Sequence, residues 1–317
     1  MKLGVNMKKH LLLSVTAMVA ATGAFAADLP SRKAPPIMTI AEPTVSWTGF
    51  YAGVNAGYSW DRKSTTDMMS SPILIGVDPK AGPGGGPFAN TAIGAATGAT
   101  GTFGAGSSGH FIGGGQIGYN YQFGQSLVTG LEVDLQGLAG GGGNGVGVSL
   151  GPVPSPPGPA GTAYQTILGN SKAIDYLGTV RARLGYLVTP ALLFYGTGGL
   201  AYGHVSSATA LYQDVSSPNL QPVMGGVSGS STKFGWTLGV GGEWKFAENW
   251  SVKLEYLYYD LGSQTNSFAV AQVGPPRIAL QFINIVQART RFNGDIIRAG
   301  VNYHFNLGGS APVVAKY

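Results

Sequence analysis

The chain has 317 residues, of which 52 are glycine, 19 are proline and none is cysteine, and only 10% are charged. Without thiols it cannot form disulfide scaffolds, cysteine–zinc sites, iron–sulfur clusters or cysteine nucleophiles. Its hydrophobic content of 44% argues against intrinsic disorder, which combines low hydrophobicity with high net charge. The composition therefore predicts a folded, glycine-rich and charge-poor protein.

Much of the formal net charge of +5 comes from the first residues. Three lysines precede an apolar stretch over residues 11–21, and Ala24-Phe25-Ala26 fits a small-residue cleavage site. We therefore predict a signal peptide over residues 1–26. A membrane anchor is the alternative, but the apolar stretch is too short for a bilayer core of about 30 Å. Without these lysines, 16 basic residues face 14 acidic ones, and nucleic-acid binding loses its main support.

Most of the remaining sequence alternates between two kinds of residue with a period of two, which predicts β-strands. In the clearest segment, 127–137, aliphatic residues alternate with positions that include Glu132 and Asp134. Each segment is near the length of about ten residues with which a tilted strand crosses a bilayer. The predicted strands are 47–59, 110–123, 127–137, 175–186, 192–203, 234–246, 250–259 and 293–305.

The connections between these strands alternate in length, as short periplasmic turns and long extracellular loops do in outer-membrane barrels. The long ones are 60–109, 138–171, 204–232 and 262–292. We predict an all-β fold, a closed antiparallel eight-stranded transmembrane up-and-down barrel with four long extracellular loops. Alternation alone leaves a soluble β-sandwich open. The predicted parts are a proline-rich periplasmic leader (27–46), the barrel (47–305) and a C-terminal tail (306–317).

The charged face of each strand is predicted to point into the lumen. An arginine or lysine facing lipid near the midplane costs about 2–4 kcal/mol. We expect cross-strand ion pairs between Glu132 and Arg181 and between Glu243 and Lys253. Because side chains can fill an eight-stranded barrel, we predict a plugged lumen. The predicted lumen charge network consists of Glu132, Asp134, Asp175, Arg181, Arg183, Glu243, Lys245, Lys253, Glu255 and Arg298.

Aromatic residues on the opposite face gather near the strand ends, where the headgroup regions of a membrane would lie. These residues predict two interfacial girdles. The predicted girdle residues are Tyr119, Tyr121, Tyr186, Trp236, Trp244, Trp250, Tyr256, Tyr258, Tyr303 and Phe305.

Three segments carry a resemblance to a known family: SWTGFYAGVNAGY (46–58), KLEYLYYDLG (253–262) and RAGVNYHF (298–305). They look like the small outer-membrane β-barrel proteins of alphaproteobacteria, often called outer-membrane immunogenic or surface-antigen proteins. These are similar in architecture to the OmpA transmembrane barrel. The resemblance implies a cell outer membrane location, a structural or surface role and, less directly, porin activity. It supplies no catalytic site.

We expect a monomeric barrel that stabilises the envelope and displays its loops, with a narrow diffusion pore as the alternative. An outer-membrane lipid-modifying enzyme would need a His/Ser/Asp constellation that the sequence does not show. Glycine- and proline-rich stretches at 82–87 and 152–159 predict mobile surface loops, or else a ligand-binding loop. The expected partners are outer-membrane lipid, including lipopolysaccharide, and the barrel-assembly machinery, which would read Phe305 or Tyr317 as the insertion signal. No cofactor, metal or nucleic acid is expected.

Overall fold

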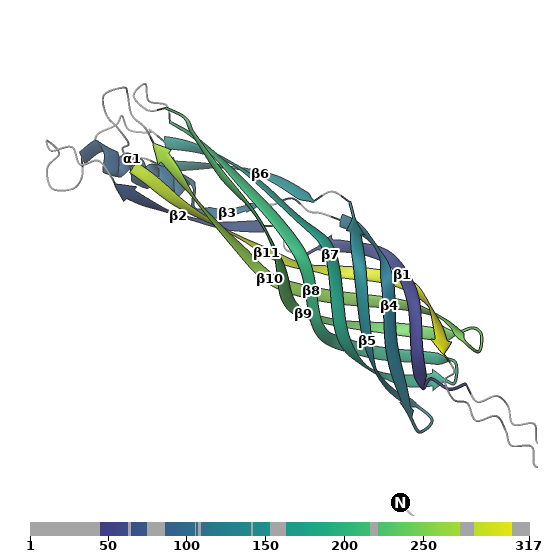
Figure 1. Cartoon of the computed structure of the whole chain (residues 1–317). Coiled ribbons are helices and arrows are strands. Elements are labelled where there is room, and N and C mark those ends of the chain that lie inside the picture. Colours follow the sequence, from purple (N-terminus) through teal and green to yellow (C-terminus); the bar gives the residue numbers. More distant parts are fainter. Residues whose placement is uncertain are drawn as a thin grey trace, which may run out of the picture. The chain divides into compact units, whose positions relative to one another are not determined.

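A closed ring of eight antiparallel strands is the central feature of the fold (Figure 1). The computed structural model describes residues 45–62, 65–74, 86–104, 106, 109–140, 142–152, 163–215, 221–272 and 282–305. The last strand pairs with both its predecessor and the first strand, which closes the ring and confirms the predicted barrel. In ring order the strands are β1 (Gly49–Asp61), β4 (Gly109–Phe123), β5 (Leu127–Ala139), β7 (Ala163–Thr189), β8 (Leu192–Val215), β9 (Val223–Lys245), β10 (Trp250–Gln272) and β11 (Phe282–Phe305).

Three tight connections join neighbouring strands at one end of the ring, at residues 124–126, 190–191 and 246–249. Gly124 has a φ of 59°, a left-handed conformation that glycine adopts without strain. Phe50 at the start of β1 lies opposite Phe305 at the end of β11, so both strand ends are also here. The predicted signal peptide, most of the leader and the tail with Tyr317 lie outside the described residues.

At the opposite end the strands continue well beyond their predicted lengths. β7 has 27 residues and β8 has 24, so parts of the predicted loops at 138–171, 204–232 and 262–292 are strands instead. The predicted loop at 60–109 likewise contains β2 (Thr65–Leu74), helix α1 (Gly86–Gly98) and β3 (Gly101–Gly104), and the next one contains β6 (Gly143–Pro152). Most of the glycine- and proline-rich stretches at 82–87 and 152–159 lie outside the described residues.

We call this part the extension. It comprises β2, β3, β6, α1 and the distal strand residues 163–174, 204–215, 223–235, 261–272 and 282–292. Gly225 in β9 allows its two layers to pack closely. A Cβ atom on Gly225 would lie only 2.7 Å from a methyl of Val270. No helix among the described residues is long and apolar enough to cross a membrane.

The extension consists of two sheets, because the ladder between β9 and β10 ends at Trp236 and Asp260. Beyond this point β9 pairs with β8, and β10 pairs with β11. One sheet therefore has the order β6-β7-β8-β9 and the other β10-β11-β2-β3. Side chains from both sheets form a shared apolar core with Met68, Ala99, Phe103, Leu168, Leu211, Val270, Val286 and Ala288. Helix α1 adds a second contact through Ala92 and Ala95, which pack with Tyr164 and Phe282.

Two register shifts lie near the junction between ring and extension. One is in β7 between Ile174 and Tyr176, and the other is in β10 between Asp260 and Ser263. A bulge adds residues to one strand only, so it exchanges the two faces of that strand. In β7 the buried positions are accordingly even-numbered before the shift, as at Lys172, and odd-numbered after it, as at Arg181.

Candidate functional site, the barrel interior

The centre of the barrel interior is occupied by Arg181 and three carboxylates. Its guanidinium donates to Asp134 at 2.8 Å and to Glu255 at 2.9 Å, and it also pairs with Glu132. Glu132 and Asp134 lie on β5, while Glu255 comes from β10, so this one arginine links distant parts of the wall. All four side chains are buried. A buried charge is tolerated only when it is paired and hydrogen-bonded in this way.

Four further charged residues extend this arrangement. Arg298 on β11 donates to Asp134 at 3.0 Å and to Glu255 at 2.7 Å. Lys253 on β10 donates to Glu132 at 2.9 Å. Arg183 donates to Glu243 at 2.7 Å and lies 3.8 Å from Glu132. The central network therefore balances four positive and four negative side chains, namely Arg181, Arg183, Lys253, Arg298, Glu132, Asp134, Glu243 and Glu255.

Uncharged residues complete the network, and they were absent from the predicted set. The Tyr51 hydroxyl donates to Glu132 at 2.7 Å and accepts from Arg183 at 3.0 Å. Tyr195 donates to Glu255 at 3.1 Å, and the guanidinium of Arg183 lies 3.9 Å from its ring centroid. Tyr51 could have been found, because it shares the inward face of β1 with Asn55. Selecting residues by charge alone passed over it.

Glycines on the inner wall make room for these large side chains. A Cβ atom on Gly118 would lie 2.4 Å from the Tyr51 ring, and one on Gly57 would lie 2.7 Å from Arg298. Such distances are shorter than any ordinary carbon contact, so a side chain at either position would displace the network. The strand glycines of β1 and β4 are therefore a condition for the ionic interior.

Two members of the predicted lumen set lie outside the central network. Asp175 occupies the β7 register shift, and its side chain is 61% exposed and 3.9 Å from His204, so its predicted place in the lumen is wrong. Lys245 is buried at the short-turn end, where it donates to the backbone oxygen of Ser46 at 2.6 Å. Lys253 lies opposite Glu243 in the ladder, and it forms ion pairs with Glu132 and Glu255.

Apolar layers lie on both sides of the central network. Towards the short turns Trp47 packs with Val128, Leu187, Leu193 and Tyr195, and its indole donates to the oxygen of Pro190 at 3.0 Å. Towards the extension there is a larger cluster, which we call the distal apolar layer. It consists of Ile112, Ile174, Leu177, Ala201, Val205, Leu257, Tyr259, Leu261, Phe292 and Ile296. The interior is thus filled in successive layers by apolar, ionic and again apolar side chains.

The outward face of the ring is apolar and bears aromatic residues at two levels. Near the short turns, Trp250 and Tyr303 pack edge to face, and Tyr121 packs on Phe123. Near the extension, Trp236 packs against Tyr258. The structure places every predicted girdle residue on this outward face, with side chains that are exposed or half-buried: Tyr119, Tyr121, Tyr186, Trp236, Trp244, Trp250, Tyr256, Tyr258, Tyr303 and Phe305.

A family model described as the outer membrane protein beta-barrel domain matches residues 12–305. The chain belongs to this family. It is 34% identical over 316 residues to the 31 kDa outer-membrane immunogenic protein of Brucella melitensis, with 94% of this chain and 100% of the relative covered. The 22 kDa outer membrane protein of Rhizobium leguminosarum bv. viciae is 34% identical over 173 residues, covering 53% of this chain and 63% of the relative.

Among solved structures, the outer membrane protein OprG from Pseudomonas aeruginosa is 12% identical, with a TM-score of 0.33 and coverage of 83% of this chain and 99% of that chain. The predicted family resemblance and outer-membrane location are confirmed by the family model and by the names of the relatives. This member of the outer membrane protein beta-barrel family therefore exposes its apolar outward face to lipid.

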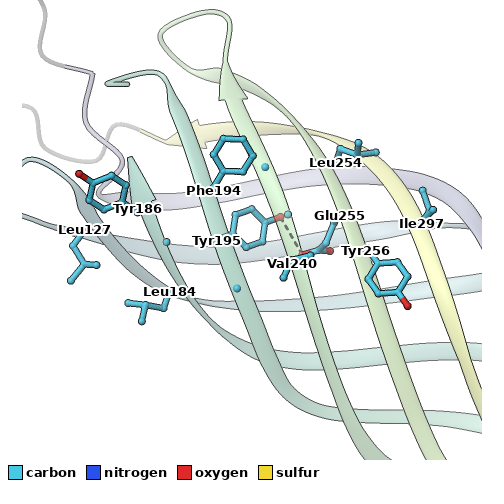
Figure 2. A pocket seen from close by; sticks show the side chains of 14 residues that line it. Leu127, Leu184, Tyr186, Phe194, Tyr195, Val240, Leu254, Glu255, Tyr256 and Ile297 are labelled. Atoms are coloured by element: carbon cyan, nitrogen blue, oxygen red, sulfur yellow. Dashed lines mark hydrogen bonds between the residues drawn. The ribbon is translucent and has the colours of Figure 1, made fainter. Parts of the chain in front are cut away.

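On this lipid-facing side the family member has an open hollow of about 770 Å³ (Figure 2). It crosses strands β5 to β11, where Gly196 lies between Leu184 and Val240 on the neighbouring strands. Figure 2 also shows Tyr195 with its bond to Glu255, the link from this wall to the ionic interior. Among the described residues, no group of three or more His, Asp or Glu side chains could hold a metal ion.

Proposed function

We propose that this protein is a closed, non-conducting outer-membrane barrel that stabilises the envelope and presents the extension at the cell surface. The filled interior is the observation that carries the proposal. An ionic layer between two apolar layers leaves side chains where a channel would need water. The strands of the ring run directly into the extension, so the barrel acts as its rigid mount. The proposal treats the chain as a monomer and assigns it no catalytic role.

Conductance across a planar bilayer tests the closed interior. The full chain, refolded in detergent, is added to the bilayer beside a general porin as the positive control. Insertion is followed independently by the shift of the folded band on a gel run with and without boiling. We expect inserted protein and no steady current steps. Regular single-channel steps from the wild-type protein would instead support the alternative, a narrow pore for small solutes.

Surface presentation can be tested by labelling, because the chain has no cysteine of its own. Ser228→Cys places a thiol at an exposed position of β9 in the extension, and Glu248→Cys places one in an exposed short turn. On intact cells a membrane-impermeant maleimide should label the first variant only. After lysis both should react. Labelling of Glu248→Cys on intact cells would reverse the orientation and overturn the proposal.

A further inference from the structure

A compact polar cluster lies on the outward face where the ring meets the extension. It contains Arg62 after β1, Asp260 on β10, and Arg291 and Asp295 on β11. The side chains of both aspartates are only 5% exposed, whereas those of Arg62 and Arg291 are 59% and 49% exposed. The two carboxylates are therefore covered, whereas the two guanidiniums face outwards.

Neighbouring groups hold the guanidiniums in place. Arg62 donates from Nε to Asp295 at 3.2 Å, and its guanidinium carbon lies 5.1 Å from the ring centroid of Tyr258. The Tyr256 hydroxyl donates to the other oxygen of Asp295 at 2.5 Å. Arg291 donates from Nη2 to Asp260. Both arginines are thus fixed from behind by a buried carboxylate, which is how a binding arginine is positioned.

Each guanidinium keeps donors for a further ligand. Arginine has five N–H groups, and within the described part of the chain the ion pairs above use one nitrogen of each residue, Nε of Arg62 and Nη2 of Arg291. The backbone nitrogen of Arg62 donates to the oxygen of Asn293, two residues from Arg291 on the same face. Their carboxylate partners, Asp295 and Asp260, lie on the adjacent strands β11 and β10, so the two arginines belong to one cluster.

The cluster lies at the height of a lipid headgroup. Below it the outward residues are apolar, such as Leu254 at 63% and Ile297 at 48% exposure. Above it, polar residues such as Thr265 and Arg289 appear on the outward face of β10 and β11. The aromatic pair Trp236 and Tyr258 marks the boundary. This boundary faces away from the short periplasmic turns, so it belongs to the outer leaflet.

We propose that Arg62 and Arg291 form a binding site for a phosphate group of an outer-leaflet lipid. Arginine presents paired N–H donors that match a phosphate, and such charge-assisted bonds are strong where water is scarce. The carboxylates of Asp260 and Asp295 are covered and do not face the ligand, so they orient the donors. The site lies on the outer wall and does not depend on whether the lumen is closed.

The test is a titration of the full-length folded protein in detergent with lipid A that carries two phosphates, followed by native mass spectrometry. The same glycolipid without phosphates and inorganic phosphate alone are the comparison ligands. We expect a bound phosphorylated lipid, at least about tenfold weaker binding of the dephosphorylated form, and no competition from inorganic phosphate. The double variant Arg62→Gln/Arg291→Gln should lose about tenfold or more in affinity, the effect of two lost charge-assisted bonds.

Arg289→Gln is the control matched to each single substitution, because Arg289 is also exposed on the outward face of β11 and loses one positive charge. Its affinity for phosphorylated lipid A should stay within about twofold of wild type, as expected for a charge outside the site. An equal loss in both variants would mean general attraction and would overturn the site. Competition by inorganic phosphate would overturn the assignment to a lipid. If the double variant does not give the folded gel band, Arg62→Gln alone carries the test.

Discussion

The ring and the extension share the same strands but differ in the side chains that they bury and expose. In the ring, Arg181 and Glu132 are buried inside while Leu131 and Leu184 face outwards. In the extension an apolar cluster that includes Leu168 packs between the two sheets. The ring exposes apolar side chains to lipid, whereas the outward face of the extension mixes polar residues such as Thr265 with apolar ones such as Val146 and Phe234. A strand that continues from the ring into the extension must therefore change its pattern of buried and exposed residues at the boundary.

The largest expected effect is in the ionic interior. Arg181→Ala leaves three carboxylates without their shared partner and should destabilise the barrel by about 3–5 kcal/mol. Equilibrium denaturant unfolding of protein in detergent or vesicles, followed by tryptophan fluorescence, measures this loss. Arg289→Ala, an exposed arginine in the extension, should change stability by less than about 1 kcal/mol. Equal losses of unfolding free energy in the two variants would contradict the difference between the ring and the extension.

The core of the extension should respond locally. Leu168 is fully buried between the two sheets, and Leu168→Ala should cost about 2–5 kcal/mol through lost burial and the cavity left behind. Faster proteolysis and hydrogen exchange should appear in the extension, while the heat-modifiable gel shift of the ring stays intact. Its neighbour Ile167 faces outwards and is 36% exposed, so Ile167→Ala is the control. Loss of the gel shift in Leu168→Ala would show that the parts unfold together.

A pair of substitutions on the outward face of β10 tests the change of solvent. Leu254→Arg places a charge in lipid and should destabilise the folded protein in vesicles by about 2–4 kcal/mol. Thr265→Arg places the same charge on the same strand within the extension and should cost almost nothing. Unfolding of both variants in phospholipid vesicles measures the contrast. A similar cost at Thr265 would move the membrane boundary into the extension.

The smallest effect concerns Asp175, which the sequence placed among the lumen charges. Its exposed side chain lies 3.9 Å from His204, so Asp175→Ala should change the unfolding free energy by less than about 1 kcal/mol. The same unfolding measurement used for Arg181→Ala applies. A loss of several kcal/mol would indicate instead that the Asp175 side chain takes part in the interior network.

Much of the barrel could be predicted because lipid penalises exposed charge, and the two-residue period then assigns the faces. This reasoning identified Arg181 and Glu132 and the opposing apolar face. It failed at Asp175, since nothing in the local sequence marks the inserted residue of a bulge. It also read the extension as loops, because small residues such as Gly225 are compatible with either a loop or a tightly packed strand. Packing against the opposing sheet determines that these residues form strands, and that sheet is built from distant parts of the chain.

The register shift at Asp175 exchanges the inward and outward faces of β7. From Ala163 to Ile174 the buried side chains are even-numbered, and from Tyr176 to Thr189 they are mostly odd-numbered. Deleting Asp175 would remove the shift and turn Lys172 away from Asp61, its buried partner at 3.0 Å. A graft of this extension onto another barrel must therefore carry the shift with it, or its core residues would be exposed to water.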